Sequence, residues 1–293
     1  MTASVRQRDS CDGSSADRRI ALICAPACLN SRDTDGNHID ARKYRVTDTV
    51  CRNLGDPTRW TGHVNDQAIC IGWAGYDEKV DWLPIEHWLA REFRDALYAS
   101  CKRGRLKGQG PDGKLLVRVR EEGDRWQLEH LLVTLQQRPE TSFLDLCAGI
   151  AATVEETYRR IQRNDPRWCA LWSDVELMLN PNGPLLNGGS DGDNGQTGRK
   201  LVMDYFGPRV PIGGGAQSGK DPSHVDRKGA LLARRIACEA IRQGSAECLT
   251  SITYAPGVSE PITQTILTLK HTSGHRRPTS CPHCPAPTTR QKI

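Results

Sequence analysis

The chain of 293 residues contains few aromatic side chains, which make up 5% of the total, and no long apolar run. Because a membrane-spanning helix needs about 18 or more consecutive apolar residues, the sequence predicts none. The first residues, MTASVRQRDSCDGSSADRR, also lack the apolar stretch of a secretory signal. The net charge is only +5 and the basic residues are dispersed without a recognition motif, so we expect neither a membrane nor a nucleic-acid partner.

Disulfide bonds are not expected either, although the chain has twelve cysteines, spread from Cys11 to Cys284. Most of them stand singly within apolar runs, where a reduced thiol acts as a small core residue. This usage indicates a cytoplasmic protein. Near the end, His271, His275, Cys281 and Cys284 supply four ligands for a tetrahedral zinc site, but the gap between the two pairs is short for a zinc finger.

Hydrophobic periodicity predicts a mixture of helices and strands, with hairpins rather than regular strand–helix–strand repeats. Apolar positions at helical spacing predict helices over residues 85–103, 142–161 and 224–243, and a short helix is expected to end near residue 55. Short apolar runs predict strands at residues 19–29, 66–74, 115–120, 125–136, 200–206, 249–258 and 265–270. Such a mixture favours an α+β fold in which helices cover one face of mixed sheets.

Two glycine-rich loops carry the residue types that a phosphate-binding site needs. The first holds TGRK at residues 197–200, and the second holds SGKDPSHVDR at residues 218–227. Glycine lets the backbone approach phosphate oxygens, Lys and Arg offset their charge, and a carboxylate binds Mg²⁺. The alternative is that the glycines mark tight turns and the cations are solvated.

Residues 214–220 also have the glycine and lysine spacing of a P-loop. Asp221, however, replaces the Ser or Thr that binds Mg²⁺ in that motif, and the preceding VPIGG does not look like a buried strand. The P-loop interpretation is therefore weak.

The glycine-rich region resembles the most recognisable part of the S-adenosylmethionine synthetases, or methionine adenosyltransferases. The stretch NPNGPLLNGGSDGDNGQTGRKLVMDYFG, followed by GGGAQSGKDPSHVDR, is similar to the family patterns NPTGRF-x-x-GGPxGDxGLTGRK and GGGAFSGKDPxKVDR. Further matches lie in the family's order: DQAICIGWA at residues 66–74, PDGK at 111–114 and ITYAPGVSEP at 252–261. The resemblance covers most of residues 19–270.

The resemblance implies an enzyme that transfers the adenosyl group of ATP to the sulfur of methionine and releases phosphate and diphosphate. It also implies repeated domains of sheet plus helices. The expected organisation is a disordered lead-in at 1–17, a truncated N-terminal domain at 18–62, a central domain at 63–187, a truncated C-terminal domain at 188–270 and a polar tail at 271–293.

The phosphate-side roles that the resemblance implies fall on basic residues of the matching motifs. Arg199, Lys200 and Lys220 would hold the phosphates of ATP and act in catalysis. Lys114, in the PDGK motif, would touch a substrate phosphate. The alternative for Lys114 is an exposed cation at the edge of a strand.

The remaining roles implied by the resemblance concern the metal and the substrates. Asp226 would bind Mg²⁺, although its position three residues after Ser223 also fits a helix capping box. Asp66 and Asp193 would contact methionine and adenosine. His224 stands where the family has a Lys close to the substrate.

Several family positions are occupied differently in this chain. No GHPDK segment, which in the family carries a catalytic His and a Mg²⁺-binding Asp, is found before Arg19, and Ile23 stands at the position of a potassium-binding Glu. Leu185 replaces the aromatic that stacks on adenine, Pro184 replaces the Arg before it, and Gln217 replaces a Phe. A potassium site is therefore doubtful, and we expect the isolated chain to be catalytically impaired or dependent on a partner.

Two kinds of function remain open from the sequence. One is a synthetase-like enzyme; the other is a non-catalytic homologue that binds nucleotide or polyphosphate, or that acts as a regulatory subunit of a full-length synthetase. The family's active site lies between two subunits, and the apolar runs around Ile69 and Leu201 match its buried sheet faces. We therefore expect a homodimer, or a heterodimer with a full-length synthetase.

Overall fold

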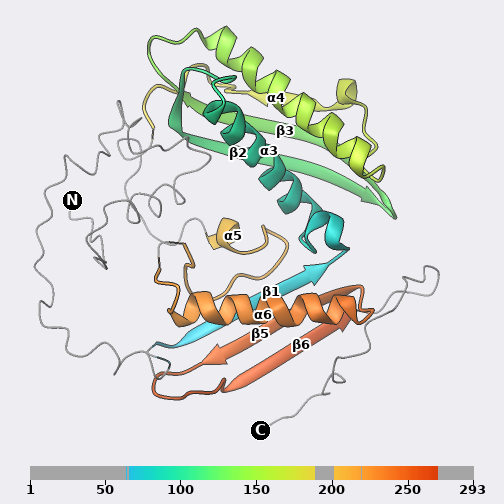
Figure 1. Ribbon diagram of the computed structural model, residues 1–293, viewed down its shortest axis with the longest axis vertical. Coiled ribbons are helices and arrows are strands. Elements are labelled where there is room, and N and C mark those ends of the chain that lie inside the picture. Colours follow the sequence, from blue (N-terminus) through green and yellow to red (C-terminus); the bar gives the residue numbers. More distant parts are fainter. Residues whose placement is uncertain (1–63, 65, 189–200, 219, 270–293) are drawn as a thin grey trace, which may run out of the picture. The chain divides into compact units, whose positions relative to one another are not determined.

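The computed structural model describes residues 64, 66–188, 201–218 and 220–269 (Figure 1). Within these ranges the chain forms two compact units that alternate along the sequence. Residues 85–188 form the first unit, and residues from 64 to 84 and from 201 to 269 form the second. Helices and sheets occur in both, so the α+β class is confirmed. The predicted elements at 19–29 and near residue 55 lie outside the described residues, and the predicted domain boundaries stay predictions.

The first unit is a three-stranded sheet covered by two helices (Figure 1). The strands β2 (Gln109–Glu122) and β3 (Arg125–Gln137) form the predicted hairpin, and β4 (Glu176–Leu179) pairs parallel to β3. The helices are α3 (Ile85–Lys102) and α4 (Phe143–Asn164), and a short 3-10 helix, η2, spans Trp172–Asp174. Sequence patterns missed β4 because its four residues pair with residues of β3 that lie 46 positions earlier, and local periodicity does not record such a pairing.

Several aromatic side chains pack together in the core of the first unit. The Trp168 ring lies at the centre, with ring centroids 5.9 Å from Trp88 and 5.1 Å from Trp126. Trp126 and Trp168 are each about 1% exposed. The Arg167 guanidinium lies 4.0 Å from the Trp126 ring centroid. The same guanidinium donates hydrogen bonds to the Asp165 carboxylate. Stacked and edge-on rings with a paired cation stabilise this core.

The second unit has the sheet order β1-β5-β6, with both pairs antiparallel. Its strands are β1 (Ala68–Gly75), β5 (Glu247–Tyr254) and β6 (Thr263–Leu269), and its helices are α5 (Leu201–Asp204), α6 (Val225–Arg242) and the 3-10 helix η1 (Glu78–Val80). Helix α6 lies across one face of the sheet (Figure 1). Gly72 allows this close approach, because a Cβ there would overlap the backbone of Ala233.

The three long helices were predicted within a few residues of their observed ends. The Ser142 side chain caps α4 as expected, because its Oγ accepts a hydrogen bond from the backbone N–H of Asp145 at 3.3 Å. Each helix is amphipathic, with apolar residues against its sheet and charged residues outside. Among the described residues, none of the helices combines the length and apolar character that crossing a membrane requires.

The predicted strand at residues 200–206 is wrong. Residues Leu201–Asp204 form the short helix α5, and Tyr205 and Phe206 follow it as buried side chains. A short apolar run does not distinguish a strand from a helix by periodicity. The helix is favoured because it brings the Asp204 carboxylate to the backbone N–H groups of Gln217 and Ser218.

A strained turn follows β1 and is held by one arginine of α6. Tyr76, Asp81 and Trp82 all have positive φ angles, between 51° and 58°, which non-glycine residues adopt at a cost. The Arg234 guanidinium donates hydrogen bonds to the main-chain carbonyls of Trp73, Asp81 and Trp82. These bonds tie the turn to α6 and offset the strain.

We expect Arg234→Ala to lower the free energy of unfolding by about 2 kcal/mol or more, because several charge-assisted hydrogen bonds to backbone carbonyls are lost together. Urea unfolding followed by tryptophan fluorescence measures the change. The matched control is Arg235→Ala, at the exposed neighbouring position, which should change stability by less than about 0.5 kcal/mol. Equal stability of the two variants would show that Arg234 does not hold the turn.

Candidate functional site

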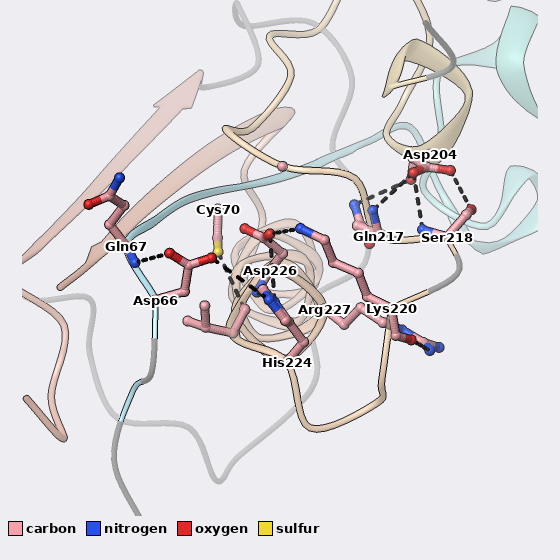
Figure 2. Close-up of polar contacts among 12 residues, drawn as sticks. Asp66, Gln67, Cys70, Asp204, Gln217, Ser218, Lys220, His224, Asp226 and Arg227 are labelled. Atoms are coloured by element: carbon pink, nitrogen blue, oxygen red, sulfur yellow. Dashed lines mark hydrogen bonds and ion pairs between the residues drawn. The ribbon is translucent and has the colours of Figure 1, made fainter. Parts of the chain in front are cut away.

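The N-terminus of α6 and the segment before it bring together Asp66, Lys220, His224 and Asp226 (Figure 2). The Lys220 ammonium donates a hydrogen bond to Oδ2 of Asp226. The two ring nitrogens of His224 face two carboxylates: Nδ1 lies 3.6 Å from Oδ2 of Asp226, and Nε2 lies 3.8 Å from Oδ2 of Asp66. All of these residues belong to the second unit, and Asp66 precedes β1.

The Asp226 carboxylate is the buried charge of this group, with a side chain that is 5% exposed. It lies in the first turn of α6, where the partial positive charge of the helix end favours an anion. Gly215 passes so close that a Cβ there would overlap the carboxylate. A carboxylate this buried needs a compensating cation, and Lys220 supplies it.

His224 is the N-cap residue of α6, and the capping-box interpretation of Ser223 and Asp226 is wrong. The ring Nδ1 of His224 accepts a hydrogen bond from the backbone N–H of Asp226 at 3.1 Å. The Ser223 hydroxyl instead donates to the Asp221 carboxylate. Because Nδ1 is an acceptor, the proton of the neutral ring is on Nε2, the nitrogen that faces Asp66.

Cys70 lies beside this group on β1, and its thiol is not set up as a nucleophile. The Sγ atom donates to the backbone carbonyl of Val225, with a donor–acceptor distance of 3.7 Å. Burial raises the pKa of the Cys70 thiol to about 12; the negative charge of Asp226 adds to the rise and the Lys220 charge opposes it. A thiol with so high a pKa stays protonated at neutral pH.

The loop before Lys220 is tied to the end of α5. Backbone N–H groups of Gln217 and Ser218 donate to Oδ2 of Asp204 at 2.9 and 3.1 Å. The Tyr205 hydroxyl donates to the backbone carbonyl of Gly215 at 3.0 Å, and burial raises the pKa of Tyr205 to about 12. Sequence reasoning missed Asp204 and Ser218 as site residues, because their spacing of 14 positions has meaning only once α5 is a helix.

The other predicted site residues are placed differently or are not described. Lys114 belongs to the first unit, where it is exposed on the edge strand β2 opposite Thr134. This position fits an exposed strand-edge cation, and the phosphate-binding role of Lys114 stays a prediction. Asp193, Arg199 and Lys200 lie outside the described residues, as do Ile23 and the His and Cys residues of the tail.

The P-loop interpretation of residues 214–220 is excluded by the elements around it. No strand lies between α5 and Lys220 among the described residues, and α6 begins only at Val225. In a P-loop a strand leads into the loop and the helix follows directly after the lysine. Lys220 therefore reaches the N-terminus of α6 from a turn rather than from the helix itself.

The group offers carboxylate ligands for a metal ion, with Asp226 as the predicted Mg²⁺ ligand. Within the described part of the chain, no three or more His, Cys, Asp or Glu side chains are gathered so that they could hold a metal ion. The hard oxygen donors of the group are the carboxylates of Asp226 and Asp66. Magnesium is commonly bound by one or two carboxylates together with substrate phosphates, so Asp226 fits a Mg²⁺ ion that a phosphate ligand also binds.

Comparison with known proteins extends this picture beyond the geometry. Residues 187–278 match the family described as the S-adenosylmethionine synthetase C-terminal domain. The S-adenosylmethionine synthase of Helicobacter hepaticus is 34% identical over 199 residues, which are 67% of this chain and 50% of that protein. The S-adenosylmethionine synthase of Wolinella succinogenes is 35% identical over 211 residues, covering 71% of this chain and 52% of that protein.

A solved structure gives the same relationship at the level of the fold. The structure of an unusual S-adenosylmethionine synthetase from Campylobacter jejuni superposes with a TM-score of 0.59 and 28% identity, over 70% of this chain and 53% of that one. The chain thus spans about half the length of the relatives that it matches. These findings identify it as a member of the S-adenosylmethionine synthetase family that carries the family's C-terminal domain at residues 187–278.

Proposed function

We propose that the chain binds the polyphosphate of ATP with Mg²⁺ at the N-terminus of α6, as part of a synthetase-like site for adenosyl transfer to methionine. The observation that carries the proposal is the pairing of Lys220 with the buried Asp226 carboxylate at this helix end. An ammonium, a carboxylate and a helix N-terminus are the groups that a Mg²⁺–polyphosphate needs. The family membership supports the same ligand.

The proposed reaction is a displacement at the ribose 5′ carbon of ATP by the methionine sulfur. Negative charge grows on the departing polyphosphate, and Lys220 and the end of α6 stabilise it. Bound Mg²⁺ would add charge neutralisation at the phosphate oxygens, held by Asp226. Asp66, whose side chain is 52% exposed, offers a carboxylate to the ammonium group of methionine. The roles of Lys114, Asp193, Arg199 and Lys200 stay predictions from the resemblance.

A second candidate function is polyphosphate binding without appreciable turnover, and His224 favours it. The family has a Lys at this position, whereas the His224 ring serves as the cap of α6 and accepts a hydrogen bond at Nδ1. A ring held at the helix end by this bond is shorter in reach than the flexible side chain of a lysine. Holding ground and transition states equally well does not speed the chemical step.

The open face of the β1-β5-β6 sheet supports a dimer as the working form. On the face away from α6, the paired residues Trp73, Leu249 and Leu267 form an apolar row across the strands, buried at Trp73 and exposed at Leu267. Leu267 and Leu269 are 56% and 62% exposed. The expectation that the run around Leu201 forms a second such face is wrong, because Leu201 lies on the helix α5. The proposed partner is a second copy of the chain or a full-length synthetase.

We expect the purified chain to be a dimer at micromolar concentration in light scattering, because exposed apolar rows of this kind mark association surfaces. Leu267→Glu should shift the mass to that of a monomer by placing a charge in the row. The matched control is Leu144→Glu on α4, where an equally large side chain is 77% exposed outside the sheet face. A wild-type chain that stays monomeric would contradict the proposal.

Calorimetry with inorganic tripolyphosphate tests the phosphate-binding role of the Lys220–Asp226 pair. We expect Mg²⁺-dependent binding by the wild-type chain, and Lys220→Ala should weaken it by at least about 1.5 kcal/mol, the scale of a charge-assisted hydrogen bond. Asp226→Asn should remove the Mg²⁺ dependence and raise the affinity in the absence of Mg²⁺, because Lys220 is then released from its carboxylate partner.

Lys79→Ala is the control for this experiment, since Lys79 is an exposed lysine of the same unit. It should bind tripolyphosphate as the wild type does. No heat of binding by the wild-type chain at millimolar tripolyphosphate would reject the proposed function.

An assay with ATP, methionine, Mg²⁺ and K⁺ separates the two candidate functions. We expect the chain alone to form S-adenosylmethionine more slowly than about 1 s⁻¹, a rate ordinary for enzymes. His224→Lys, which restores the family's residue, should raise the rate if the missing lysine is what limits the chemical step. The same assay with added full-length synthetase reports partner dependence. Turnover of the wild-type chain alone at ordinary enzyme rates would contradict this account of His224.

A further inference from the structure

The Asp204 carboxylate at the end of α5 accepts more hydrogen bonds than a surface aspartate ordinarily does (Figure 2). Its Oδ2 accepts from the backbone N–H groups of Gln217 and Ser218, at 2.9 and 3.1 Å. Its Oδ1 accepts from the Ser218 hydroxyl at 2.5 Å. Hydrogen bonds to an ionised acceptor are about twice as strong as neutral ones, so this carboxylate is a firm anchor.

Two further bonds join the same short stretches of chain. The Tyr205 hydroxyl donates to the carbonyl of Gly215 at 3.0 Å, and the Gln217 side-chain amide donates to the carbonyl of Asp204 at 3.3 Å. Tyr205 is itself 3% exposed, so its ring does not move freely. Residues 215–218 are thus held to residues 204 and 205 at several points, although they form no helix or strand.

Lys220 lies two residues after this anchored stretch. On its other side, the Arg227 guanidinium of α6 donates to the Lys220 carbonyl at 2.7 Å. The backbone that carries the Lys220 side chain is therefore held from both directions, by Asp204 through Ser218 and by Arg227. A lysine side chain is long and flexible, so the position of the Lys220 ammonium depends on its held backbone as well as on its ion pair with Asp226.

We propose that Asp204 is a positioning residue that holds the 215–218 loop and thereby places Lys220 to bind polyphosphate. The carboxylate of Asp204 is itself occupied by loop donors, so it acts through Lys220 and not by touching the ligand. This inference rests on the function proposed above. It adds Asp204 to that site. Asp204 belongs neither to the two glycine-rich motifs nor to the residues for which the resemblance implies substrate contacts.

In the sequence, α5 also directly follows the TGRK motif, for which binding of the same polyphosphate is predicted. Leu201, the first residue of α5, directly follows Arg199 and Lys200 of the TGRK motif. The four residues of α5 therefore link that motif to the aspartate that anchors the second loop. A single short helix thus joins, in the sequence, the two segments for which phosphate binding is predicted.

A double-mutant cycle tests the proposal with inorganic tripolyphosphate and Mg²⁺ in calorimetry. Asp204→Asn keeps the size of the side chain and removes its charge, and we expect binding about tenfold weaker than in the wild type, the scale of a charge-assisted hydrogen bond. In a Lys220→Ala background, the same substitution should have no further effect. A residue that merely stabilised the fold would weaken both backgrounds equally.

Ser218→Ala provides a milder second variant, because it removes only the hydroxyl bond to Asp204 and should weaken binding by a few fold. It decides the question if Asp204→Asn does not fold. The matched control is Asp174→Asn, which removes an exposed aspartate that accepts from the Ser173 hydroxyl at 3.0 Å in the other unit. This control should bind as the wild type does.

The outcomes distinguish the two proposals from each other. If wild type binds tripolyphosphate but Asp204→Asn and Ser218→Ala bind equally well, Asp204 does not position Lys220 and the proposed function stands. Equal losses with and without the Lys220 side chain overturn the positioning role in the same way. If the wild-type chain binds no tripolyphosphate, both the proposed function and this inference are rejected.

Discussion

Burial of the Asp226 carboxylate at the start of α6 is the constraint on which the described part of the site depends. A charge with almost no exposure to water is costly unless cations and donors surround it. The Lys220 ammonium, the end of α6 and the nearby His224 ring provide that surrounding. Gly215 is required by the same contact, because no side chain fits where its backbone passes the carboxylate.

The sheet and helix core of the second unit determines where this carboxylate lies. Helix α6 packs directly on β1, and Gly72 and the buried Ala233 make their close contact possible. That contact places the N-terminus of α6 beside the residues that precede β1, so Asp66 faces His224 across 3.8 Å. A larger side chain at position 72 would move α6 outward and carry Asp226 with it. The geometry of the site therefore depends directly on how α6 packs on β1.

Most regular elements of the described residues could be predicted from local patterns. The helices α3, α4 and α6 have apolar residues at helical spacing, and Ser142 caps α4 as its sequence position suggests. The β2–β3 hairpin follows from two β-rich runs separated by a short polar turn. The pattern failed for α5 and β4, because both are four residues long and depend on partners distant in sequence.

By itself, the sequence determined the α+β class, the long helices and strands, the family resemblance and the membership of Lys220 and Asp226 in one motif. Periodic burial and residue chemistry are local properties, so they can be read along the chain. Only the tertiary structure decided that His224 caps α6 in place of Ser223, that Lys220 pairs with Asp226, and that Asp204 holds the loop before Lys220. These choices depend on which donors and acceptors meet after α6 packs on β1, and local spacing does not contain that information.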